Sequence, residues 1–179
     1  MSIHDFYINH FSNLCCYEDF LMRIDLMGRK HNDKEVLDSL PKCNGHGYIV
    51  AAGEVIWIND NGEKVDNPNI TCVPEYAFSY CTEIQRIVIP DSVTRIGGGA
   101  FKGCGELTYV KIPCGVTSID RSAFYGCYEL TSVTIPYSVT SIGDYAFDLC
   151  FNLKSAKVPK NCNIGRDVFP PDCAVQYYY

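Results

Sequence analysis

Apolar residues recur along the chain from about position 65 onward with a period of 23 residues. An Ala-Phe pair marks each period, and a cysteine follows each pair at a fixed offset. The pairs are Ala77 and Phe78, Ala100 and Phe101, Ala123 and Phe124, and Ala146 and Phe147, and the cysteines are Cys81, Cys104, Cys127 and Cys150. A fixed period of this length predicts a solenoid, in which each unit buries its apolar side against its neighbours.

Within one unit, Val110 and Ile112 alternate with Lys111, the pattern of a strand with one buried face. Pro113 then ends the strand, because proline has no N–H to donate to a ladder. The segment SVTSIG alternates again, and AFxxC is expected to form a compact turn around the aromatic ring. With neighbouring strands about 4.8 Å apart, roughly five coils would give a body on the order of 25 Å long.

The two ends of the array depart from the repeat, as terminal units of a solenoid do. Ile70 and Val73 keep the phase of the apolar columns before the first Ala-Phe pair. Val168 and Phe169 come one residue early at the other end. The closing segment AVQYYY, residues 174–179, predicts a last strand with aromatic cover.

These residues resemble the BspA-like subfamily of leucine-rich repeats, whose units read IGxxAFxxCxxLxxVxIPxSVTS, and residues 95–117 and 118–140 match that form closely. The resemblance implies a right-handed solenoid with a parallel β-sheet on its concave face. It also implies surface-exposed or secreted proteins of bacteria and some protists that bind host or partner proteins. A continuous asparagine ladder is not expected, because the corresponding positions hold Ser92, Gly115, Ser138 and Asn161.

Residues 1–64 lie outside the repeat and are expected to form a small α+β cap on the solenoid of residues 65–179. A helical pattern covers residues 14–40, broken near Gly28, and residues 42–47 are expected to form a loop. Residues 48–58 predict a strand or a hairpin around Gly53, and NDNG at 59–62 is a turn signal.

Charge and cysteine usage narrow the function classes. The net charge of −6 argues against non-specific binding to nucleic acid. The start of the chain has no signal-peptide pattern and no stretch is long and apolar enough for membrane insertion. We therefore expect a cytoplasmic or virion-associated protein with reduced thiols, or a surface or secreted one if the chain is a processed form. A bacterial or phage source fits these expectations.

Candidate chemistry is sparse. The four repeat cysteines are spaced by one coil rather than as metal or redox pairs, so they are expected to be buried, inert thiols. Cys43 and His46, with Cys15, Cys16 and His31, could form a zinc site or a Cys-His pair, but no second motif supports either. We predict no enzyme activity, no metal and no cofactor.

The face of the predicted sheet that points away from the core is the better candidate for function. It carries basic, hydroxyl and aromatic side chains without an acidic residue in the strands, although the whole chain is acidic. An acidic protein segment or a glycan would suit this face, and an ordinary solvated sheet face is the alternative. The candidate binding residues are Arg86, Tyr109, Lys111, Ser132, Thr134, Lys154 and Lys157.

The predicted function is a non-enzymatic protein-protein interaction or adhesion module that acts through this concave face. The alternative is a structural or assembly protein, such as a virion component or a self-associating scaffold. Self-association would use the ends of the stack or the terminal residues Tyr177, Tyr178 and Tyr179, which could equally cap the last coil.

Overall fold

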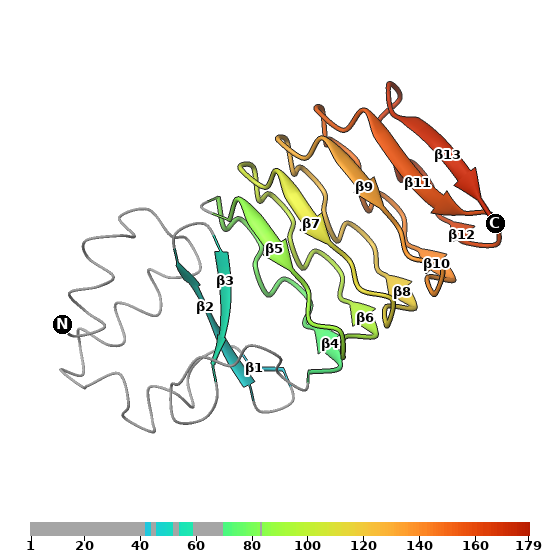
Figure 1. Cartoon of the computed structure of the whole chain (residues 1–179). Coiled ribbons are helices and arrows are strands. Elements are labelled where there is room, and N and C mark those ends of the chain that lie inside the picture. The colour runs from blue at the N-terminus through green and yellow to red at the C-terminus, as the bar shows by residue number, and fades with distance from the viewer. Residues whose placement is uncertain (1–41, 44–45, 52–53, 59–69, 83) are drawn as a thin grey trace, which may run out of the picture.

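The computed structural model describes residues 42–43, 46–51, 54–58, 70–82 and 84–179. The helical pattern predicted for residues 14–40 and the turn predicted for residues 59–62 lie outside these residues. Figure 1 shows the described repeats as successive coils that stack side by side toward the C-terminus. No helix is present in the described part of the chain.

One strand of each coil belongs to a parallel column on one side of the solenoid (Figure 1). Consecutive members pair one repeat apart, as in Arg86 with Tyr109 and Ser132 with Ser155. The hydrogen-bonded ladder is interrupted between the second and third members. These long strands are β5 (Arg86–Val88), β7 (Tyr109–Lys111), β9 (Ser132–Thr134), β11 (Ser155–Pro159) and β13 (Ala174–Tyr178). The parallel solenoid and its final strand are therefore confirmed.

The SVTSIG segments form a second parallel sheet of two-residue strands. This short-strand sheet has five members that pair in register, as in Arg95 with Ser118. They are β4 (Cys72–Val73), β6 (Arg95–Ile96), β8 (Ser118–Ile119), β10 (Ser141–Ile142) and β12 (Asn163–Ile164). Each coil thus contributes one long and one short strand, and the buried residues lie between the two sheets and the turns.

A hairpin precedes the first coil. Strands β1 (Lys42–Cys43), β2 (His46–Ala51) and β3 (Glu54–Ile58) pair antiparallel in sequence order. The predicted hairpin is confirmed, whereas the loop predicted at 42–47 is wrong at both ends, because these residues pair with each other. Strand β3 also pairs parallel with β5, Glu54 opposite Arg86, so the hairpin extends the long-strand sheet. The division at residues 64 and 65 stays a prediction.

A ladder of phenylalanine rings runs through the core. Phe78, Phe101, Phe124 and Phe147 are fully buried, and consecutive ring centroids lie 5.0, 5.1 and 5.0 Å apart with nearly parallel planes. Phe169 continues the stack 5.5 Å from Phe147 but is only partly buried. The 23-residue period places each ring directly beside the equivalent ring of the next coil, so the aromatic core is continuous along the solenoid.

The turns that carry these rings depend on left-handed backbone. In each of the four coils with an Ala-Phe pair, the residue just before the pair and the second residue after its phenylalanine have positive φ angles. Gly103 shows why glycine suits such a position: its φ is 73°, and an added Cβ would lie 2.5 Å from the Tyr80 ring. Non-glycine residues occupy several equivalent positions, among them Tyr145 and Leu149, with φ of 59° and 57°.

Candidate binding surface

Alternation within the long strands separates a buried side from a solvent side. Ile87, Val110 and Val133 point into the core, and the residues on either side of each are exposed. The exposed residues form the long-strand face, which comprises Gln85, Arg86, Val88, Thr108, Tyr109, Lys111, Thr131, Ser132, Thr134, Lys154 and Lys157, with the partly buried Ser155. The seven candidate binding residues of the sequence analysis all lie on this face.

Strand register gathers these residues into two rows. Arg86 pairs with Tyr109, and Ser132 pairs with Ser155, and these four residues occupy equivalent positions of successive repeats that form one row. Val88 pairs with Lys111, and Thr134 pairs with Lys157, in a second row. At about 4.8 Å per strand, Lys111 and Lys157 are roughly 10 Å apart along the stack. Residues that are 46 positions apart in sequence therefore lie on the same small area of this face.

Local contacts orient the charged side chains of this face. The Arg86 guanidinium lies over the Tyr109 ring, 4.5 Å from its centroid. The Lys154 Nζ donates a hydrogen bond to the Phe151 carbonyl at 3.2 Å. A cation held against a neighbouring ring keeps its charge while losing some side-chain freedom. Lys111 is the last residue of β7 and Lys157 lies in the middle of β11, and both side chains are exposed.

An aromatic pair borders the long-strand face and was not predicted as part of it. Tyr128 and Phe151 stack with centroids 5.7 Å apart, and they are 45% and 61% exposed. Each residue directly follows a repeat cysteine, at a position that holds Gly105 one coil earlier. The signal was present as an aromatic residue in two successive units of that column. Beside the pair, the Asn152 amide donates to the Glu129 carboxylate at 3.3 Å.

The repeat cysteines have structural roles. The thiols of Cys104, Cys127 and Cys150 are fully buried, and each donates to the carbonyl of a phenylalanine one coil earlier, at 3.1, 3.2 and 3.2 Å. Burial raises the pKa of Cys104 to about 12 and raises that of Cys127 well above its usual range. The Cys104 and Cys127 thiols therefore stay protonated, as expected for inert residues.

Cys81 departs from the column, because it is disulfide-bonded. The prediction of a reduced thiol is therefore wrong at this position. The first repeat has no preceding Ala-Phe turn whose carbonyl could accept from its sulfur, as the later cysteines have.

The terminal tyrosines differ from one another. The Tyr178 hydroxyl donates to the Ile135 carbonyl at 2.5 Å, which ties β13 to a coil two repeats earlier. Burial raises the pKa of this phenol. Tyr177 is 58% exposed, and Tyr179 is 87% exposed with the Lys160 ammonium 4.2 Å from its ring centroid. Tyr178 therefore fastens the last strand, whereas Tyr177 and Tyr179 leave aromatic surface in solvent.

Other chemistry receives no support from the described residues. They contain no group of three histidine, cysteine or acidic residues arranged to hold a metal. The side chains of Cys43 and His46 are not described, and Cys15, Cys16 and His31 lie outside the described ranges. A search of the same ranges found no helix with the length and hydropathy to cross a membrane.

Comparison with known families gives one match that covers most of the chain. The family described as BspA type leucine rich repeat region matches residues 58–176 in six copies. Among curated proteins, none matches the chain.

Two solved structures share the fold. A leucine-rich repeat protein from Bacteroides ovatus is 26% identical with a TM-score of 0.54, and a leucine rich cell surface protein from Faecalibacterium prausnitzii is 24% identical with a TM-score of 0.60. Each match covers 76% of this chain and 40% of the solved one. The chain thus spans about two-fifths of the length of these structures.

Proposed function

Because the chain belongs to the BspA type leucine-rich repeat family, whose repeats form protein-interaction scaffolds, we propose that it binds an acidic segment of a partner protein through the long-strand face. The observation that carries this proposal is a group of cations on one face of an acidic molecule. Arg86, Lys111, Lys154 and Lys157 all lie on this face, and none of its described positions is acidic.

Electrostatics favour an extended acidic ligand. The molecule carries a net charge of −6, so an acidic partner would be repelled by most of the surface and attracted to a local basic face. Lys111 and Lys157, roughly 10 Å apart along the stack, are separated by a distance close to the Debye length of about 8 Å at physiological ionic strength, so both can act on one ligand. Tyr109, 40% exposed beneath Arg86, adds an aromatic surface of the kind common at interfaces.

The test uses a fluorescent ten-residue glutamate peptide as an electrostatic probe of the full chain. The double variant Lys111→Glu with Lys157→Glu should weaken binding by about tenfold or more, since it replaces two attractions with two repulsions. Added salt should weaken binding of the parent protein. Affinity would be measured by fluorescence anisotropy, and amide NMR shifts would locate the contact.

A matched control is available on other surfaces. Lys102→Glu with Lys160→Glu makes the same change in net charge away from the long-strand face. This control should bind the peptide nearly as the parent does. Equal loss in both double variants would mean that net charge alone drives binding, and unchanged affinity in the Lys111 and Lys157 variant would remove the long-strand face from the proposal.

A second candidate function is self-assembly through the C-terminal end of the stack. Strand β13 pairs with β11 on one side and has no further strand beside it in the described residues. Phe169 and Val175, which pack on the core, are only partly buried there, and Tyr177 is 58% exposed. An open strand edge beside apolar side chains is suited to pairing with a second copy.

A further inference from the structure

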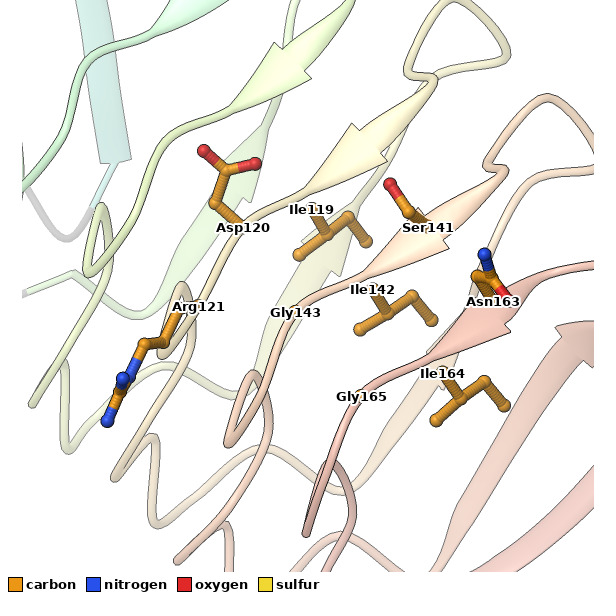
Figure 2. A pocket seen from close by; sticks show the side chains of 9 residues that line it. All are labelled: Ile119, Asp120, Arg121, Ser141, Ile142, Gly143, Asn163, Ile164 and Gly165. Atoms are coloured by element: carbon orange, nitrogen blue, oxygen red, sulfur yellow. The ribbon is translucent and has the colours of Figure 1, made fainter.

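A shallow groove crosses the short-strand sheet, on a different side of the solenoid from the long-strand face. It has a volume of about 350 Å³, within the range of about 300 to 1,000 Å³ usual for small-ligand sites. Its lining comes from three successive coils, as Figure 2 shows. The groove is lined by Ile119, Asp120, Arg121, Ser141, Ile142, Gly143, Asn163, Ile164 and Gly165.

Polar side chains border this groove, beside apolar surface of its backbone and side-chain carbon atoms. In Figure 2, Asp120, Ser141 and Asn163 extend from one side of their strands, and the isoleucine side chains point away from them. Ile119 and Ile142 are only 1% and 2% exposed, so they offer mainly backbone to the groove. The groove therefore offers a ligand polar groups at its border together with a small apolar surface.

The hydroxyl and amide of the groove are free to bind a ligand. In the neighbouring column, Thr94, Thr117 and Thr140 each donate a hydroxyl to a carbonyl of the preceding coil, at 2.9, 3.0 and 3.1 Å. Within the described residues, the side chains of Ser141 and Asn163 have no such protein partner. They stand on paired strands, about 4.8 Å apart, with their hydrogen-bonding capacity directed to solvent.

Glycine keeps the floor of the groove open. Gly143 and Gly165 carry no side chain above the backbone, and an added Cβ would lie 2.4 Å from the Arg121 nitrogen or 2.6 Å from the Asp144 nitrogen. The close approach of successive coils therefore requires glycine at both positions. The result is exposed backbone bordered by polar side chains.

The charged side chains at the groove have partners within the protein. The exposed Arg121 guanidinium lies over the Tyr145 ring, 5.4 Å from its centroid. The Asp120 carboxylate accepts from Arg95 Nε at 2.8 Å, and Asp144 beside the groove pairs with Arg166 at 3.1 Å. A charged ligand would have to compete with these ion pairs. A neutral ligand with several hydroxyl groups can instead use Ser141, Asn163 and the remaining acceptor capacity of Asp120 together.

We propose that this groove binds a neutral glycan. A sugar ring presents hydroxyl groups on successive carbons, so one ring can reach both Ser141 and Asn163 while its C–H face lies on Gly143 and Gly165. This site is independent of the proposed peptide-binding face, and the two can be tested separately in the same protein.

The experiment is an amide NMR titration of the full chain with glucose, galactose, mannose and N-acetylglucosamine, each alone. At least one sugar should cause saturable shifts confined to the amides of Ser141, Gly143, Asn163 and Gly165 and their neighbours. The double variant Ser141→Ala with Asn163→Ala should bind that sugar about tenfold more weakly, because two hydrogen-bonding groups are lost.

Ser118→Ala is the matched control, since Ser118 occupies the same column one coil earlier and does not line the groove. It should leave sugar affinity unchanged. Both altered side chains of the double variant are without protein hydrogen bonds, so its circular dichroism and melting should match the parent. Absence of saturable shifts with every sugar, shifts at another surface, or equal binding by the double variant would overturn the proposal.

Discussion

At the scale of single residues, burial decides which cysteines can react. Cys104, Cys127 and Cys150 are fully buried and donate to backbone carbonyls, whereas Cys114 is an exposed free thiol. The same residue type therefore serves as a small core residue in the repeat turns and as accessible surface elsewhere. The 23-residue spacing separates the two groups, because Cys114 lies outside the repeat column.

We expect iodoacetamide at pH 8 to modify Cys114 in the folded protein and to spare Cys104, Cys127 and Cys150. Reaction requires an accessible thiolate, which burial denies to the three repeat cysteines. Peptide mass spectrometry after brief labelling measures the modified fraction at each site, with urea-unfolded protein as the control for full reactivity. Equal labelling of the buried and exposed cysteines in native buffer would contradict this assignment.

The raised pKa values of Cys104 and Cys127 add a pH dependence to stability. Between the ordinary thiol pKa of about 9 and the folded value of about 12 for Cys104, the unfolded chain binds fewer protons than the folded one. The free energy of unfolding should therefore be fully retained below pH 9 and fall as the pH rises above it. Urea titrations at pH 8 and pH 10 would measure this fall, and Cys104→Ala should reduce it.

At the scale of elements, the phenylalanine ladder joins successive coils through their largest fully buried side chains. Each ring contacts the ring before and after it at about the same separation, from 5.0 to 5.1 Å among the four buried members. The backbone supports the same spacing, since the Phe101 N–H donates to the Ala123 carbonyl at 2.7 Å. An interior ring therefore has two aromatic neighbours, and a terminal one has fewer.

We expect Phe124→Ala to lower the free energy of unfolding by about 3 to 5 kcal/mol, because it leaves a cavity between two stacked rings. Phe169→Ala is the comparison at the end of the ladder, and it should cost clearly less since Phe169 is already partly exposed. Urea unfolding followed by circular dichroism gives both values. Equal losses of unfolding free energy in the two variants would contradict a larger contribution from a ring with two aromatic neighbours.

At the scale of the whole molecule, a solenoid leaves its two ends and its sheet faces as distinct surfaces. The hairpin β1 to β3 adjoins the first coil through β3 and β5, while β13 lies at the far end (Figure 1). The long-strand face and the groove of the short-strand sheet lie between these ends. The proposed binding to a foreign partner and the proposed self-assembly would therefore use different parts of the molecule and can be tested separately.

The interaction proposal predicts a monomer of 20.1 kDa by light scattering over a wide range of concentration. A mass that rises with concentration would instead favour self-assembly through β13. In that case Tyr177→Lys should restore the monomer, because it places a charge at the open end of the core. Tyr137→Lys is the control, since Tyr137 is 71% exposed and lies on a different part of the coil.

Much of this architecture follows from the chain alone. The 23-residue register of Phe101, Phe124 and Phe147 predicts the stack, because identical units bury apolar surface only when equivalent residues meet. Alternation around Lys111 likewise predicts which side chains of the long strands face solvent. These features repeat at a fixed period, and a fixed period can be read directly from the amino-acid sequence.

Other features depend on contacts between residues of neighbouring coils. The prediction missed the stacking of Tyr128 on Phe151, and it could not anticipate that Tyr178 bonds to Ile135, since each contact depends on distances across coils. The groove at Ser141 and Asn163 likewise exists because neighbouring strands bring the two side chains together above glycine. The sequence by itself determined the repeat and its buried face. Only the tertiary structure decided which solvent-facing groups became neighbours, because surface positions are not constrained by the packing that sets the period.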